Sequence, residues 1–252
     1  MKAKYLNLMT VGAVLVAAPY AKAIPLDLKA AGSSGSINGA FFTTTANQST
    51  GTGVINPFVR VQDNGIADGY NASARPVMPD VNNSAQFTRD LTLSSVPLVS
   101  IRGTAYYEFL LDINQTAANP WLSLDKLDIY TRGTALSTAN TLAALTGSST
   151  LRYSLDAGSD SKILLDYNNN NGSGSGDMFA YIPQSVFGAP TDYLYLYSSF
   201  GETGGDYREN DGFEEWAVRT PGTTTRVPDG GSTLALVGLA IAGLGLARRK
   251  LS

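Results

Sequence analysis

The sequence predicts an all-β body, an antiparallel β-sandwich or jelly roll, between two terminal apolar segments. Two observations support this fold class. Short runs of apolar, aromatic and β-branched residues recur at short intervals, separated by Gly, Pro, Asn and Asp clusters. Helical periodicity is nearly absent. A chain of 252 residues, 43% of them hydrophobic, is long enough for one sizeable domain.

Residues 1–23 have the three parts of a secretory signal peptide. Lys2 and Lys4 give a charged start, an apolar run covers residues 6–18, and Ala21 and Ala23 form a small-x-small cleavage pattern. The alternative is an uncleaved N-terminal anchor. Because the run is shorter than the roughly 20 residues that a membrane span needs, we expect signal peptidase to cleave after Ala23.

Residues 24–53 are rich in Gly, Ser, Thr, Ala and Asn, which predicts a flexible leader with at most one short edge strand near Phe41. The β-sandwich body follows over residues 54–220. Its first strand covers 54–61, where Pro57 favours an edge or a bulge because proline lacks a ladder donor. Further strands are predicted at 87–93, 96–101, 105–113, 127–131, 151–155, 162–167, 178–182, 193–197 and 214–218.

Alternation is clearest in 193–197, where three tyrosines interleave with Leu194 and Leu196. Period 2 places the tyrosines on one face of the strand and the leucines on the other. The best helix candidate is 135–145, although its Thr and Ser content disfavours a helix.

Charge and composition exclude several functions. Residues 24–229 carry 12 cations against 21 acids, a net charge of −9, which disfavours nucleic acid and anionic membrane surfaces as partners. The chain contains no cysteine and no histidine. Disulfides, thiolate zinc sites, cysteine nucleophiles and Ser-His-Asp triads are therefore excluded. We expect no catalytic residues, and an enzyme would have to use carboxylate, Lys or Tyr chemistry.

One loop resembles the order of ligands in an EF-hand. Asp166, Asn168 and Asn170 supply oxygens at positions one, three and five, and Asp177 supplies a carboxylate at position twelve. Position six is not Gly, position twelve is not Glu, and the flanks look like strands. The loop is thus either a calcium site or a solvated turn between strands. Calcium is the only cofactor that the sequence suggests.

Two further acidic regions have a functional and a plain reading. Residues 63–70 hold two carboxylates and two glycines, which fits a hairpin or surface turn better than a metal site. A second region contains six acids close together in the sequence. Glu214 and Glu215 beside Trp216 suggest the paired carboxylates of a glycoside hydrolase, whereas the plain alternative is an acidic loop entering a strand. The six acids are Glu202, Asp206, Glu209, Asp211, Glu214 and Glu215.

Aromatic residues are abundant in the predicted strands. They suggest a sugar-stacking face, because carbohydrate-binding modules often combine a β-sandwich with coplanar aromatics; tyrosine is also a favoured residue on any half-buried sheet. The candidates are Tyr106, Tyr107, Trp121, Tyr130, Tyr153, Tyr193, Tyr195 and Tyr197.

The C-terminal segment 221–252 consists of a linker, a motif, an apolar run and a basic end. The apolar run 233–247 makes about 22 Å of helix at 1.5 Å per residue, short of a hydrocarbon core of roughly 30 Å unless the preceding residues join it. Arg248, Arg249 and Lys250 mark its cytoplasmic end and so place the body outside. The alternatives are a transient sorting helix and a permanent single-span transmembrane anchor.

The motif at residues 227–232, Val-Pro-Asp-Gly-Gly-Ser, is followed by the apolar run and the basic end. This three-part order resembles the PEP-CTERM class of bacterial sorting signals, in particular its Val-Pro-Asp-Ser-Gly variant. The resemblance implies recognition by an exosortase in the inner membrane, with only transient membrane contact, and release or attachment at the cell surface. It also implies bacteria that make exopolysaccharide and biofilms. The motif residues are Val227, Pro228, Asp229, Gly230, Gly231 and Ser232.

The sequence therefore predicts an exported bacterial surface or extracellular-matrix protein, structural or adhesive in an exopolysaccharide or biofilm setting. Its partners would be signal peptidase and an exosortase during export, and exopolysaccharide afterwards. The alternatives are a secreted carbohydrate-binding module and a carboxylate-based glycoside hydrolase.

Overall fold

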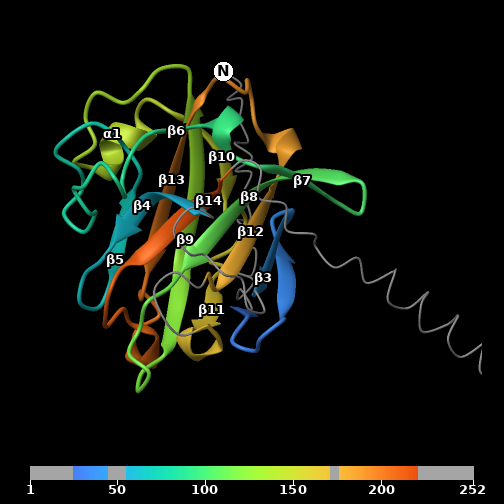
Figure 1. The fold of residues 1–252 in the computed structure, drawn as a ribbon, viewed down its shortest axis with the longest axis vertical. Helices are drawn as coiled ribbons and strands as arrows, with labels where there is room; N and C mark the ends of the chain where they lie inside the picture. The colour runs from blue at the N-terminus through green and yellow to red at the C-terminus, as the bar shows by residue number, and fades with distance from the viewer. Residues whose placement is uncertain (1–24, 45–54, 171–175, 221–252) are drawn as a thin grey trace, which may run out of the picture.

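A computed structural model describes residues 25–44, 55–170 and 176–220 of the chain. These residues form two seven-stranded β-sheets with little helix. Figure 1 shows the long strands β8, β9, β12 and β13 running through the middle of the body. The predicted all-β class is confirmed, and one large apolar core contains residues of both sheets, as in a β-sandwich.

The first sheet has the strand order β1-β11-β9-β13-β5, with β10 also paired to β9 and β6 to β13. The β1–β11 pair is parallel and the other pairs are antiparallel. Its strands are β1 (Leu26–Asp27), β5 (Ala67–Tyr70), β6 (Leu91–Thr92), β9 (Trp121–Arg132), β10 (Thr150–Ser154), β11 (Ile163–Asp166) and β13 (Tyr193–Phe200).

The second sheet is antiparallel and has the order β2-β3-β12-β8-β14-β4, with β7 also paired to β8. The β7–β8 hairpin projects from the side of the body (Figure 1). The strands are β2 (Ser34–Ile37), β3 (Ala40–Thr44), β4 (Ile55–Val61), β7 (Leu98–Ile101), β8 (Thr104–Asp112), β12 (Met178–Pro183) and β14 (Glu214–Arg219).

Helical structure in the described residues is limited to short segments. The one α-helix of the described residues, α1 (Leu142–Thr146), begins after Thr141, whose side chain accepts a hydrogen bond from the Ala144 amide. The 3-10 helices are η1 (Leu93–Ser95), η2 (Tyr167–Asn169), η3 (Gln184–Val186) and η4 (Gly205–Tyr207). The predicted helix at 135–145 therefore overlaps the observed one only at its end.

The two sheets contact each other through large apolar side chains. Trp216 on β14 is fully buried, and its indole N–H donates to the Ser198 hydroxyl on β13 at 3.1 Å, which links the sheets. Leu194 and Leu196 belong to the core, whereas Tyr195 and Tyr197 lie in a second cluster that includes Leu145 of α1. The predicted separation of tyrosines and leucines on β13 is confirmed.

The N-terminal part of the body differs from the sequence prediction. At most one short strand is predicted within residues 24–53, but β1, β2 and β3 all lie there, so this prediction is wrong. The missed signal is Asn38-Gly39, which joins β2 to β3 with φ of 50° and 84°. Asn-Gly favours the two-residue hairpin turn, whose central residues both have positive φ.

Two strand predictions near the first sheet are also corrected. Only Leu91 and Thr92 of the predicted 87–93 strand pair with a neighbour, because the residues before them form a turn. Conversely, residues 67–70 form β5 rather than only a turn. The prediction for Pro57 is confirmed: β4 is an edge strand of the second sheet, and its register with β14 shifts next to Pro57.

No helix within the described ranges 25–44, 55–170 and 176–220 is long and apolar enough to cross a membrane. The signal peptide 1–23 and the helix predicted at 233–247 lie outside these ranges.

Candidate functional site

The residues predicted to direct export and sorting lie outside the described part of the chain. These are Ala21 and Ala23 at the expected cleavage site, the motif 227–232 and the basic residues 248–250.

The predicted calcium loop connects β11 in the first sheet to β12 in the second, and its residues 171–175 are not described. Asp166 accepts hydrogen bonds from the Asn168 amide at 2.9 Å and the Trp121 indole at 3.3 Å. Asn170 donates to the Gly176 carbonyl at 3.0 Å. Asp177 is buried and accepts from the Ile113 amide at 2.8 Å, while burial raises its pKa well above the usual range. Calcium binding by these four residues stays a prediction.

The aromatic residues do not form one exposed face. Tyr107, Tyr130, Tyr153, Tyr195 and Tyr197 are all buried. Trp121 is an exception, because 37% of its surface is exposed. Its ring stacks on Tyr207 with a centroid distance of 5.6 Å and an interplanar angle of 24°. The Lys29 ammonium lies 4.5 Å from the Trp121 ring centroid and donates to the Tyr207 hydroxyl at 2.8 Å.

Glu214 and Glu215 do not form a catalytic pair. They are consecutive on β14, so their side chains point to opposite faces of the sheet. Glu214 is completely buried and accepts from the Gln115 side chain at 2.6 Å and the Asn114 amide at 3.1 Å. Glu215 forms an ion pair with Arg60. Two carboxylates on opposite faces cannot flank one glycosidic bond.

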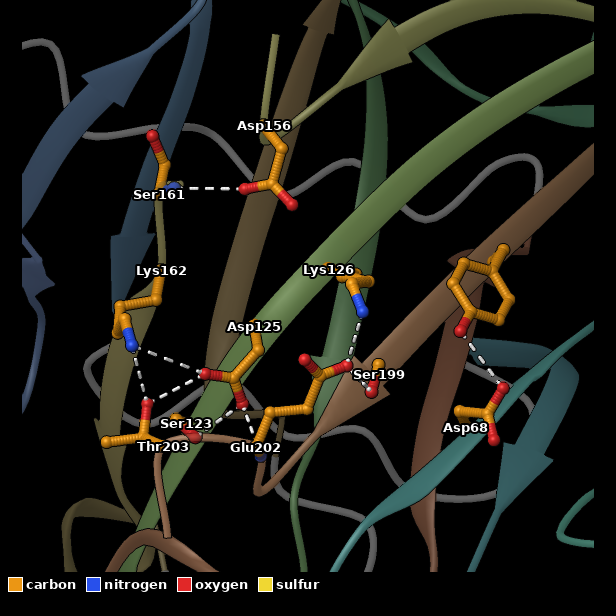
Figure 2. A network of polar contacts seen from close by, with 11 residues as sticks. Asp68, Ser123, Asp125, Lys126, Asp156, Ser161, Lys162, Ser199, Glu202 and Thr203 are labelled. Atoms are coloured by element: carbon orange, nitrogen blue, oxygen red, sulfur yellow. Dashed lines mark hydrogen bonds and ion pairs between the residues drawn. The ribbon is translucent and has the colours of Figure 1, made fainter. Parts of the chain in front are cut away.

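Glu202 belongs to a polar network formed by β9, the end of β13, the loop after it and Lys162 just before β11, shown in Figure 2. At its centre is buried Asp125, which accepts from the Ser123 hydroxyl at 2.6 Å, the Glu202 amide at 2.8 Å and the Thr203 hydroxyl at 2.7 Å. Lys162 lies 3.9 Å from Asp125. Each Asp125 oxygen thus faces hydrogen-bond donors or a cation, as expected of a structural carboxylate.

The Glu202 carboxylate is also supplied with donors (Figure 2). It accepts from the Lys126 ammonium at 2.8 Å and the Ser199 hydroxyl at 2.7 Å. Burial acts to raise the pKa of Glu202, but the hydrogen bonds from Lys126 and Ser199 and the charge of Lys126 hold it below the usual range. Both acids therefore act as hydrogen-bond acceptors within the fold, Asp125 as a buried residue and Glu202 at the surface.

Glu209 has different surroundings. Its backbone forms a two-way bridge with Gly65, with N–O distances of 3.0 and 3.1 Å, which joins the 63–70 loop to the loop between β13 and β14. Gly201 permits this contact: it has a φ of 84°, and a Cβ there would lie 2.1 Å from the Gly65 carbonyl oxygen. Two acidic loops that are far apart in the sequence thus meet beside one pocket. Its lining residues are Gln62, Asp63, Asn64, Glu209, Asn210 and Asp211.

Glu209 lies at the base of this pocket, and only 1% of its surface is exposed. Burial is the largest cause that raises the pKa of its carboxyl group to about 7, and the negative charges of Asp63 and Asp211 contribute to the same rise. The Asp63 and Gly65 amides lie close enough to lower the pKa in part, yet within the described residues neither Glu209 oxygen has a hydrogen bond of normal geometry. We call these six lining residues the Glu209 pocket.

The sequence singled out both acidic loops but not their contact. The acids differ in their partners, which come from distant parts of the chain. Glu214 is paired with Gln115, Glu215 with Arg60, and Glu202 with Lys126. Lys162 lies near Asp125, and none of these four partners is paired with Glu209. Within the described residues, no three acidic side chains already lie at the spacing of a bound metal ion.

The chain thus combines a β-sandwich-like body with a C-terminal segment of the kind that directs export and cell-surface sorting. Residues 226–251 match the model of the VPDSG-CTERM motif, and the chain therefore carries a C-terminal sorting motif of the PEP-CTERM type. Comparison with curated proteins and with solved structures gives no match.

Proposed function

We propose that this chain is a bacterial surface or extracellular-matrix protein that an exosortase processes at its C-terminal signal. The observation that carries the proposal is the VPDSG-CTERM motif at residues 226–251. In this account signal peptidase removes residues 1–23, the apolar run 233–247 holds the chain transiently in the inner membrane, and cleavage near Asp229 frees the body at the outer side.

The body would have a structural or adhesive role in exopolysaccharide or biofilm and would not be an enzyme. The carboxylates that the sequence offered for glycoside hydrolysis support this view, because Glu214 is held by Gln115 and Glu215 by Arg60 on the opposite face. The polar network around Asp125 joins β9 to the loop after β13, which suits a body that has to persist outside the cell.

Intact-mass measurement of the protein recovered from its native envelope or culture medium tests the processing. We expect a mass that begins at residue 24 and ends near Asp229. A mass that matches residues 24–252 would overturn exosortase processing and favour a permanent anchor. Replacing Val227, Pro228 and Asp229 with Ala in the expressing strain should leave the unprocessed chain in the membrane fraction.

Carbohydrate binding is a second candidate, favoured by the exposed Trp121–Tyr207 stack. Flat, exposed aromatic rings pack against sugar rings, and Asp27, Lys29 and Asp166 stand close to this pair with polar groups for hydroxyls. The Lys29 ammonium covers part of the stack, so a sugar would bind at the exposed edge of Trp121.

Affinity electrophoresis in gels containing the producing strain's exopolysaccharide tests this candidate. Trp121→Ala should abolish any retardation of the full-length chain. Leu98→Ala is the matched control, because Leu98 is 50% exposed and lies on β7 of the other sheet. Equal mobility of wild type with and without polysaccharide would remove the candidate.

A further inference from the structure

The Glu209 pocket has an unusual lining. Its volume is about 410 Å³, and all six lining side chains end in a carboxylate or a carboxamide. Gln62, Asp63, Asn64 and Asp211 are exposed, so the pocket opens to solvent, while Glu209 is buried at its base. Every one of these side chains offers an oxygen acceptor.

The surroundings of Glu209 are a second, independent observation that points to a ligand. Both of its carboxylate oxygens are buried and, although the Asp63 and Gly65 amides lie nearby, neither oxygen accepts a hydrogen bond of normal geometry from the described residues. A buried carboxylate without a donor is costly, and native proteins rarely leave one so. Of the five ion pairs in the described part of the chain, none includes Glu209. A cation from solution would supply the missing partner.

The charges that face Glu209 are almost all negative. Asp63 and Asp211 flank it at the pocket, and its own charge acts in turn on buried Glu214. The nearest cationic side chain of its loop, Arg208, is directed to Gly65, where its Nη1 would lie 3.2 Å from an added Cβ. The pocket is therefore an acidic opening with a buried anion at its base.

We propose that the Glu209 pocket binds a divalent metal ion, calcium by preference, with Glu209, Asp63 and Asp211 as its carboxylate ligands. Calcium takes six to eight oxygen ligands in flexible geometry, including amide oxygens and water, whereas magnesium requires a near-ideal octahedron. The side chains of Asp63 and Asp211 are exposed and turn inward when the ion binds. The bound ion then crosslinks the loop after β4 to the loop after β13.

Metal binding and proton binding compete at Glu209. Since burial and the neighbouring acids raise the pKa of Glu209 to about 7, part of the population carries a proton that calcium must displace. Calcium affinity should therefore rise as the pH increases from 6 to 8, and the binding heat should depend on the ionisation enthalpy of the buffer.

Calorimetric titration of the purified full-length chain with calcium chloride, and thermal melting at roughly 1 mM calcium, test the proposal. Wild type should bind calcium, melt at a higher temperature with it, and bind magnesium at least tenfold more weakly. Glu209→Gln should lower calcium affinity by tenfold or more, and Asp63→Asn should lower it by a smaller factor. Melting without calcium confirms that each variant folds.

Two matched variants locate the site. Asp160→Asn removes one charge from an exposed residue outside the pocket and should bind calcium as wild type does. Asp177→Asn removes the carboxylate of the 166–177 loop, and it too should leave the affinity unchanged. No calcium heat with wild type would overturn the proposal. Unchanged affinity in Glu209→Gln would overturn it as well, and a loss confined to Asp177→Asn would place calcium in the 166–177 loop instead.

Discussion

The loop between β13 and β14 contains two glutamates with opposite surroundings. Burial acts to raise the pKa of Glu202, but hydrogen bonds from Lys126 and Ser199 and the charges of Lys126 and Lys162 hold it below the usual range. Glu209, seven positions later, is more deeply buried, and burial raises its pKa to about 7. The Glu202 carboxylate accepts two hydrogen bonds, whereas the Glu209 carboxylate accepts none of normal geometry from the described residues.

This difference separates a structural acid from a candidate site. A carboxylate that accepts several hydrogen bonds has little left with which to bind a ligand, and its loss weakens the fold. A buried carboxylate without donors costs stability until something binds it. Both residues belong to the same run of acids in the sequence, and the supply of hydrogen-bond donors is the structural property that distinguishes them.

Replacing Asp125, at the centre of the polar network in Figure 2, should have the largest effect on stability. Asp125→Ala would leave the Ser123 hydroxyl, the Thr203 hydroxyl and the Glu202 amide without their acceptor. We expect a loss of about 4 kcal/mol in the free energy of unfolding, measured by urea denaturation. Asp160→Ala is the control, because Asp160 is exposed. A loss below about 1 kcal/mol would mean that the network is not structural.

Separating the two acidic loops should have the next largest effect. Gly201→Ala places a Cβ 2.1 Å from the Gly65 carbonyl oxygen at a positive φ, so the loops must move apart. We expect destabilisation of about 3 kcal/mol together with loss of calcium binding. Gly205→Ala shares the positive φ but meets no atom within 4 Å, and it should cost only about 1 kcal/mol. Equal destabilisation by the two variants would show that the close approach of Gly201 to the Gly65 carbonyl oxygen is not the cause.

Replacing Glu209 with Gln should stabilise the protein by an amount that depends on pH. Because the pKa of Glu209 rises from 4.5 to about 7 on folding, the native state holds this proton more tightly than the unfolded chain does. Stability is therefore lost as the pH rises from about 4.5 through 7. Glu209→Gln removes this titration. In the absence of calcium we expect the variant to be no more stable than wild type near pH 4, and more stable by about 3 kcal/mol above pH 7. Chemical denaturation across this range measures it, and a pH-independent difference would contradict the assignment.

The exposed ion pair should matter least. Lys126 and Glu202 have side-chain exposures of 42% and 34%, so solvent and salt screen their attraction. Lys126→Gln should destabilise the protein by about 0.5 kcal/mol at low salt. The difference should vanish in roughly 1 M sodium chloride. A loss that persists at high salt would show that Lys126 contributes by packing rather than by charge.

Much of the fold could be predicted from local patterns. The alternation of Tyr195 and Tyr197 with Leu194 and Leu196 correctly placed two faces of β13, and Pro57 correctly indicated an edge strand with a bulge. Composition failed for residues 26–44: Gly, Ser and Thr suggested a leader, although the Asn38-Gly39 turn specifies a hairpin. The backbone conformation of Asn38 and Gly39 thus decided the local structure, although the composition of residues 24–53 suggested a flexible leader.

The candidate site could be predicted only in part. Both acidic loops were recognisable, since Asp63 and Glu209 stand among clustered acids. Their contact depends on the backbone bridge between Gly65 and Glu209 and on the absence of a side chain at Gly201. Pairing between residues 144 positions apart leaves no local signal in either segment.

By itself, the sequence determined the all-β class and the C-terminal sorting motif at 226–251, because strand periodicity and a short linear motif are both written in consecutive residues. Only the tertiary structure decided which acids are satisfied. The packed chain brings the Gln115 amide to Glu214 and the Lys126 and Lys162 ammonium groups to Glu202 and Asp125, whereas Glu209 is buried without a hydrogen bond of normal geometry from the described residues. Burial and donor supply are properties of the packed state, so no reading of single segments can provide them.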